Sequence, residues 1–151
     1  MNGYLIDTNV LSWLLYENNI PEKLLKYWNQ IQNKQSRLIL IAPVVSEIFY
    51  KNAPNIGDEK TEYEIWKLVN SLNPKLYSLG YNDAIKAGAI KIKYSGRKKD
   101  ELSLVDCFLL AVAKRYKTSI ITTDHSIDNI GRNMNIDVRY LPFVSLSKKI
   151  S

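Results

Sequence analysis

Tyr4-Leu5-Ile6-Asp7-Thr8-Asn9 is the stretch that decides the fold, because a short apolar run stops there at an acid followed by two small polar residues. Such a run predicts a β-strand with Asp7 at its C-terminal tip. Ser119-Ile120-Ile121-Thr122-Thr123-Asp124 repeats the pattern with β-branched residues. We therefore expect Asp124 at the tip of a second strand.

Two further acids follow signals for the start of a helix. Glu47 comes shortly after Ala42-Pro43, and proline is favoured in the first helical turn. Asp106 lies in Leu102-Ser103-Leu104-Val105-Asp106, which opens an apolar helix. Both acids are expected to project from helical first turns.

The alternation of helices and strands predicts an α/β fold with three α/β/α layers and a central, mostly parallel sheet of about four to five strands. In parallel sheets the ligand crevice lies outside the carboxyl ends of the strands, where the four acids can meet. We expect strands near 3–6, 37–41, 76–79, 119–123 and 136–141. Helices are expected near 9–16, 21–32, 42–52, 59–71, 82–94, 102–116 and 127–132. A polar link is expected at 53–58 and a basic loop at 95–100.

Four carboxylates at one point need a positive partner. A pair of like charges 4 Å apart repels by roughly 4 kcal/mol at an effective dielectric constant near 20. The chain has one His and one Cys, which disfavours a zinc site built from nitrogen and sulfur ligands. Oxygen ligands instead favour Mg²⁺ or Mn²⁺.

The ordered set of motifs resembles the PIN-domain nucleases, and most closely the VapC-type ribonuclease toxins. The resemblance rests on Leu5-Ile6-Asp7-Thr8-Asn9, Pro43 followed by Glu47, Asp106 opening an apolar helix, and Ile120-Ile121-Thr122-Thr123-Asp124. It covers essentially the whole chain and implies a single PIN-like domain over residues 1–151. The charged and polar segment from Lys51 to Glu64 departs from the family pattern.

The resemblance implies roles for individual residues. The acidic quartet that holds the metal would be Asp7, Glu47, Asp106 and Asp124. Supporting residues would be Thr8 and Asn9 beside Asp7 and Thr122 beside Asp124, with Asp128 as an auxiliary acid.

The activity that the resemblance implies is Mg²⁺- or Mn²⁺-dependent hydrolysis of RNA by an endoribonuclease that is the toxin of a type II toxin-antitoxin pair. Its partners would be RNA, a small antitoxin and a second copy of the chain in a homodimer. Two alternatives remain open: an RNA-processing PIN nuclease that is not a toxin, and a catalytically idle module that binds RNA or protein. A haloacid dehalogenase-type phosphatase is disfavoured because Asn9 stands where it needs a second Asp, and no phosphate-binding loop motif occurs.

Each acid also has a structural alternative. Ser103 and Asp106 have the spacing of a capping box, in which the acid bonds back to the cap amide. Asp7 and Asp124 could cap the helices that follow them, and Glu47 could lie on a solvated helix face. His125 is expected to be an exposed polar residue rather than a general base.

The composition suits one domain that acts on a polyanion. At 151 residues, folding should bury about 68–70% of the extended chain's surface. The formal net charge is +6, so basic surface is expected around an acidic centre. The lone Cys107 is predicted to be a buried thiol. We find no signal peptide and no run of about 20 apolar residues, so we expect a cytoplasmic protein without a membrane span.

Two surfaces are candidates for contacts. A basic segment before the Asp106 helix could bind RNA phosphates or simply be a solvated loop: Lys93, Arg97, Lys98 and Lys99. Apolar residues of the early helices could meet an antitoxin or a second copy, with core packing as the alternative: Ile20, Leu24, Leu25, Tyr27, Trp28 and Ile31.

Overall fold

The computed structural model describes residues 2–16, 20–94 and 101–142. These residues form a five-stranded sheet with the order β3-β2-β1-β4-β5, and every neighbouring pair is parallel. The strands are β1 (Asn2–Ile6), β2 (Ser36–Ile41), β3 (Lys75–Tyr77), β4 (Ser119–Thr122) and β5 (Val138–Tyr140). The predicted α/β class and parallel sheet are confirmed.

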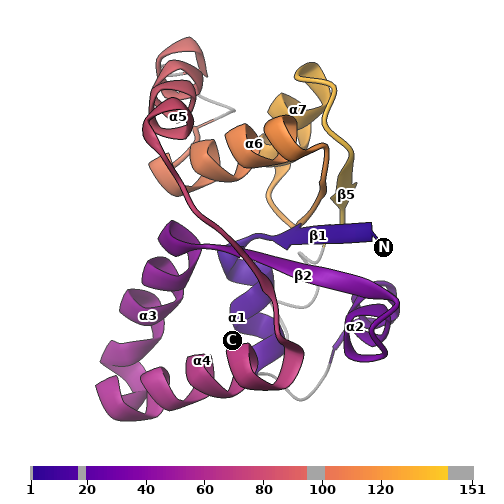
Figure 1. The fold of residues 1–151 in the computed structure, drawn as a ribbon, viewed down its shortest axis with the longest axis vertical. Coiled ribbons are helices and arrows are strands. Elements are labelled where there is room, and N and C mark those ends of the chain that lie inside the picture. Colours follow the sequence, from indigo (N-terminus) through magenta and orange to yellow (C-terminus); the bar gives the residue numbers. More distant parts are fainter. Residues whose placement is uncertain (1, 17–19, 95–100, 143–151) are drawn as a thin grey trace.

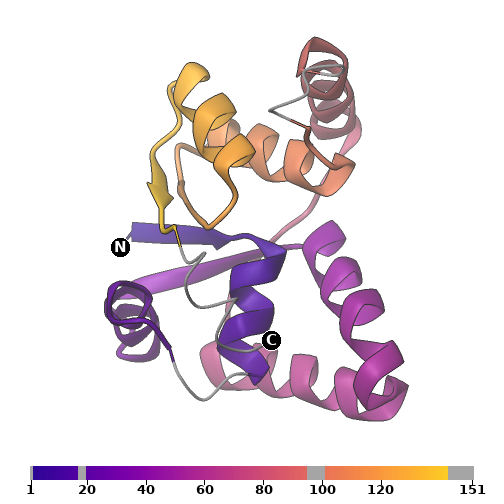
Figure 2. The same ribbon diagram turned by 180° about the vertical axis from the view of Figure 1, so that it is seen from behind.

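Helices lie on both sides of this sheet and make the predicted three layers. Figures 1 and 2 show α5, α6 and α7 on one side and α1 to α4 on the other. Their bounds are α1 (Thr8–Tyr16), α2 (Glu22–Gln32), α3 (Ala42–Ile56), α4 (Asp58–Leu72), α5 (Tyr81–Tyr94), α6 (Leu104–Tyr116) and α7 (His125–Asn133). Within the described residues, no helix combines the length and the apolar character needed to cross a bilayer.

The central strands are covered on both faces, which explains their nearly continuous apolar sequences. Leu5 and Ile6 of β1 and Ile120 and Ile121 of β4 are all buried, although successive side chains point to opposite faces. An alternating apolar and polar strand would leave polar groups in this core. The composition of these runs therefore selects a sheet sandwiched between helices.

The order of the strands creates a crevice beside β1. The chain builds β2 and β3 on one side of β1 and then β4 and β5 on the other. Parallel β1 and β4 pair in the register Ile6 with Ile121, so their carboxyl ends reach the same edge of the sheet. Such a switch point is where open α/β sheets bind ligands.

The predicted polar link at 53–58 is wrong. Helix α3 continues through Pro54 to Ile56, and Gly57 alone separates it from α4. Ala53 is buried, and its carbonyl accepts the Gly57 N–H at 2.8 Å, which closes the last turn. Gly57 has φ +91°, a backbone conformation that glycine adopts at little cost. The segment that departs from the family pattern is thus a sharp corner between two helices.

Core packing accounts for most of the early-helix residues. Leu24, Trp28 and Ile31 of α2 are buried in the core, whereas Leu25 is 39% exposed.

Cys107 is fully buried as predicted, and burial raises the pKa of its thiol to about 11.

Gly131 lets α7 approach its neighbours closely. A Cβ atom built on Gly131 would lie 2.6 Å from Val138 Cγ2 of β5 and 3.4 Å from Leu110 Cδ2 of α6. The first distance is far below a normal carbon contact. A side chain here would require the branched side chain of Val138, or the strand that carries it, to shift.

We expect Gly131→Ala to destabilise the protein, because overpacking costs about 1–3 kcal/mol and exceeds the ~0.5–1 kcal/mol gained by removing a helical glycine. Gly88→Ala in α5 is the matched control, since its Cβ would meet nothing within 4 Å. That control should gain stability. Urea denaturation measures both variants, and equal midpoints for the two would contradict the packing argument.

Candidate functional site

One pocket at the carboxyl edge of the sheet gathers the four acids from distant parts of the chain. Its volume is about 190 Å³. The residues that line it are Asp7, Thr8, Asn9, Glu47, Tyr50, Lys51, Ser103, Asp106, Asp124 and Ile127. They come from the ends of β1 and β4 and from the beginnings or middles of helices α1, α3, α6 and α7.

Asp7 is the most deeply placed acid of this pocket. It follows β1 directly and is only 3% exposed. Its Oδ1 atom accepts the Val10 N–H at 2.9 Å, which caps helix α1. The capping alternative is therefore correct for Asp7, and it coexists with a position in the pocket.

Thr122 connects the tips of the two central strands. Its hydroxyl donates to Asp7 Oδ2 and accepts the Asp124 N–H at 2.9 Å. The Asp124 carboxylate caps α7 by accepting the N–H groups of Ser126 at 2.7 Å and Ile127 at 3.3 Å. One hydroxyl group thus fixes the positions of both strand-end acids.

Asp106 forms the capping box that its spacing indicates. The Ser103 N–H donates to Asp106 Oδ2 at 3.1 Å, and the Asp106 N–H donates to Ser103 Oγ at 3.2 Å. This box holds the carboxyl group in the first turn of α6, at the wall of the pocket. Oδ1 takes no part in the box.

Glu47 lies in the second turn of α3 rather than the predicted first, because the helix begins at Ala42 directly after β2. It is 7% exposed, so the solvated-face alternative is wrong. Lys51 lies one turn further along, with its Nζ atom 3.3 Å from Glu47 Oε1 and 3.4 Å from Asn9 Oδ1. An ammonium group therefore stands at the edge of the acidic pocket.

The acids act on one another electrostatically. Burial is the main cause that raises the pKa of Asp7 to about 6, and the negative charges of Asp106 and Asp124 add to it. Burial likewise raises the pKa of Asp106, helped by the charges of Asp124 and Glu47. A site in which neighbouring negative charges disfavour the ionisation of Asp7 and Asp106 is one that a cation would stabilise.

The oxygen donors of this pocket fit a hard divalent ion, although in this structure the four carboxylates are bonded to N–H, hydroxyl or ammonium groups of the protein. Within residues 2–16, 20–94 and 101–142, no three His, Cys, Asp or Glu side chains are gathered in an arrangement that could hold a metal ion. The pocket nevertheless offers carboxylate oxygens from four elements, together with the buried Thr8 Oγ1, which has no hydrogen-bond partner in the described structure. Oxygen donors of this kind suit Mg²⁺ or Mn²⁺.

The remaining predicted residues lie away from this pocket or outside the described part. Asp128 pairs with Arg132 Nε at 2.6 Å on α7 and does not line the pocket. His125 is exposed, as expected. Lys93 is exposed near the end of α5, with its Nζ atom 5.5 Å from the centre of the Tyr94 ring. Arg97, Lys98 and Lys99 fall outside the described residues.

Sequence reasoning missed Tyr50 and Lys51 as pocket residues. Both lie within one helical turn after Glu47. Positions three and four apart on a helix share a face, so this spacing was the available signal. The predicted helix, which ended near residue 52, contained both residues, but only Glu47 was assigned to the site.

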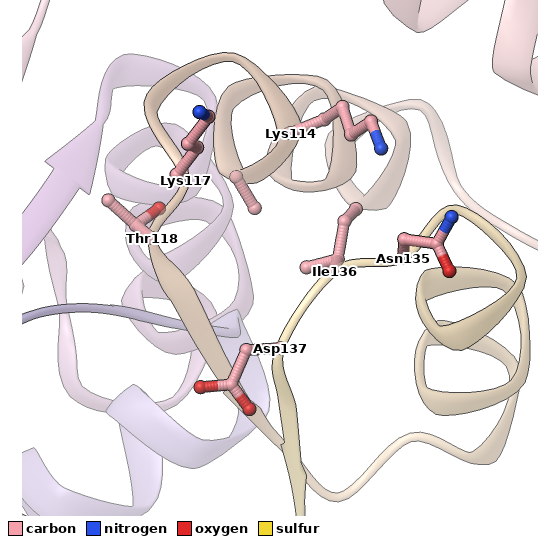
Figure 3. A pocket seen from close by; sticks show the side chains of 7 residues that line it. Lys114, Lys117, Thr118, Asn135, Ile136 and Asp137 are labelled. Carbon is pink, nitrogen blue, oxygen red and sulfur yellow. The ribbon is translucent and has the colours of Figure 1, made fainter.

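A second pocket, of about 330 Å³, lies at the other end of β4 (Figure 3). Two of its charged groups are already engaged: Lys114 Nζ donates to the Met134 carbonyl at 2.7 Å, and Asp137 accepts from Ser119 Oγ at 2.6 Å. Asp137 also pairs with Arg139 at 3.0 Å. This pocket contains no group of acids comparable with the first.

Comparisons with known proteins agree with this architecture. A family model described as PIN domain matches residues 4–133. A search of curated protein sequences gave no match.

Solved structures share the fold at low sequence identity. DNA-bound VapBC from Salmonella typhimurium has a TM-score of 0.68 and 17% identity, over 93% of this chain and 98% of that one. VapBC2 from Rickettsia felis, bound to a DNA fragment from its promoter, has a TM-score of 0.68 and 14% identity, over 92% and 98%. VapC20 from Mycobacterium tuberculosis, described as a sarcin-ricin loop cleaving toxin, has a TM-score of 0.67 and 13% identity, over 85% and 95%.

The raised pKa of Asp7 predicts how stability depends on pH in metal-free protein. A carboxyl whose pKa rises on folding favours the folded state at low pH, and this contribution is lost as pH rises from about 4 through about 6. Asp7→Asn removes the charge, so at pH 7.5 in EDTA its urea midpoint should be higher than that of wild type. Its free energy of unfolding should be larger by up to about 3 kcal/mol. At pH 4 the two proteins should converge. If the free energy of unfolding of wild type rose relative to that of Asp7→Asn as the pH rises, the predicted sign would be contradicted.

Proposed function

The chain belongs to the PIN domain family, a family of nucleases, and from this premise we propose that it is a metal-dependent endoribonuclease and the toxin of a type II toxin-antitoxin pair. The observation that carries the proposal is the pocket that collects Asp7, Glu47, Asp106 and Asp124 at the switch point of the sheet. Four acids from separate elements are costly to hold together without a cation.

In the proposed mechanism, Asp7, Glu47, Asp106 and Asp124 would hold Mg²⁺ or Mn²⁺. The bound ion would orient a water molecule, lower its pKa and stabilise charge on the phosphate. Thr122 keeps Asp7 in place through its hydroxyl group, and Thr8 and Asn9 stand beside Asp7 in the same pocket.

The chain's own carboxylates also handle the proton. One of the pocket carboxylates would accept the proton that the attacking water loses. Departure of the 3′ oxygen leaves a 5′-phosphate and a 3′-hydroxyl. The 2′-hydroxyl is then not the nucleophile.

The charge of the whole chain supports a nucleic-acid substrate. The formal net charge is +6 despite the acidic pocket. Cations on the outer surface neutralise phosphates and speed encounter, while the carboxylates remain at the centre. Lys51, which stands at the edge of the pocket, is one such cation.

The proposed partners follow from the solved relatives. VapBC structures are complexes that also hold DNA, and VapC20 is described as cleaving the sarcin-ricin loop. By analogy we propose a small antitoxin that blocks the acidic pocket, a homodimer, a single domain over the chain and a cytoplasmic location. An RNA-processing nuclease without an antitoxin is the second candidate.

We expect purified protein to cut a mixed pool of structured RNA in Mg²⁺ or Mn²⁺ and not in EDTA. Asp7→Asn and Asp106→Asn should each lower the rate at least 100-fold, because each removes a charged oxygen ligand that the water-activating ion would need. Gel analysis of end-labelled RNA measures the rate and shows whether the products carry 5′-phosphates.

Asp58→Asn is the control for this assay, since Asp58 is an exposed acid in the first turn of α4. It should cut like wild type. Equal cutting by all four proteins would point to a contaminating nuclease, and folded wild type that cuts no RNA in either metal would overturn the proposed activity.

The toxin assignment predicts growth arrest. Induced expression of wild type in a bacterial host should stop growth, and Asp7→Asn should not, because the arrest requires RNA cleavage. Co-expression of a small neighbouring gene should restore growth if that gene encodes the antitoxin. Active nuclease that leaves growth unchanged would favour the RNA-processing candidate.

A further inference from the structure

Tyr50 is an exposed aromatic side chain at the wall of the acidic pocket. It lies on α3, one turn after Glu47, and lines the same pocket as the four acids. It is 60% exposed, whereas Glu47 is 7% exposed. Helix α3 therefore turns one side chain into the acidic centre and presents an aromatic ring at its mouth.

The ring of Tyr50 has no packing role that explains this position. Other tyrosines of the described structure pair with rings: Tyr77 stacks on Tyr116 with 3.9 Å between ring centres, and Tyr4 meets Tyr27 edge-on at 5.3 Å. Tyr50 makes no ring contact and no cation contact with any residue that the structure describes. A large ring kept in water beside a polar pocket is available to a planar ligand.

Resting on the proposed nuclease function, we propose that Tyr50 stacks on a nucleobase of single-stranded RNA next to the phosphate that is cut. Aromatic side chains bind bases of any identity through their π-faces, which holds a strand without reading its sequence. Tyr50 would thus position the substrate and is not itself a catalytic residue.

Lys51 supplies the matching contact for the backbone. Its side chain is 42% exposed, and its ammonium group is held beside the pocket by Glu47 and Asn9. An aromatic ring and a cation on consecutive residues give one platform for a base and one charge for a phosphate, the combination that single-stranded nucleic acid requires. Helix α3 would therefore set the path of the strand as it enters the acidic pocket.

The test compares Tyr50→Ala with wild type on a short, fluorescently labelled single-stranded RNA. Binding is measured by anisotropy in EDTA, where metal-dependent cutting cannot proceed, and KM and kcat are measured separately in Mg²⁺. We expect Tyr50→Ala to bind about 5- to 150-fold more weakly and to raise KM with little change in kcat. Tyr50→Phe keeps the ring and should restore the affinity that Tyr50→Ala loses.

Tyr81→Ala is the matched control, because Tyr81 is 80% exposed on α5 and does not line the acidic pocket. A series of RNAs, each with one abasic nucleotide, locates the stacked base. The abasic position that weakens binding to wild type should not weaken binding to Tyr50→Ala any further, since the same contact is already lost.

The outcomes separate this inference from the proposed function. Wild type that cuts RNA, together with Tyr50→Ala of unchanged affinity and KM, would overturn the stacking role and leave the nuclease intact. Equal losses in Tyr50→Ala and Tyr81→Ala would also overturn it, since the effect would then not belong to the pocket. Wild type that neither binds nor cuts RNA would overturn both.

Discussion

The burial of a carboxylate at the end of the central strand is the constraint on which the rest of the structure depends. Asp7 is almost inaccessible, and an unpaired charge in such a place is expensive. The fold reduces this cost with a backbone N–H from α1 and the hydroxyl of Thr122, but the nearby acids raise it again. The pocket is consequently a place where a bound cation would lower the free energy of the folded chain.

Helix capping and the assembly of the pocket use the same side chains. Asp7, Asp106 and Asp124 each cap a helix with one part of the carboxyl group while lining the pocket. The caps restrict the rotation of these side chains and hold them at the N-termini of helices, where backbone N–H groups favour negative charge. A capping role for these acids is therefore compatible with a role in binding a cation.

The sequence was sufficient for the parts of the fold that depend on local pattern. The apolar runs at β1 and β4 located the strand tips, and the parallel sheet followed from the alternation of elements. It was insufficient at α3 and α4, where Pro54 and Gly57 signal a break but tertiary packing of Ala53 keeps the helix intact to Ile56. Tyr50 and Lys51 lie inside the helix that the sequence predicted, and they were missed because their spacing from Glu47, which places them on the same helical face, was not applied to them. The hydroxyl link through Thr122 depends on the register of β1 with β4, which no local pattern reveals.

The hydrogen bond between Thr122 and Asp7 joins residues 115 positions apart in the chain. During synthesis, Asp7 is added first, and Thr122 in the strand that completes its surroundings is added 115 residues later. Contacts of such long sequence separation form late, because the intervening loop must first be closed. A growing or prematurely terminated polypeptide that ends before Thr122 therefore lacks the completed pocket, and the ribosome that makes this protein does not meet that pocket until Thr122 has been added.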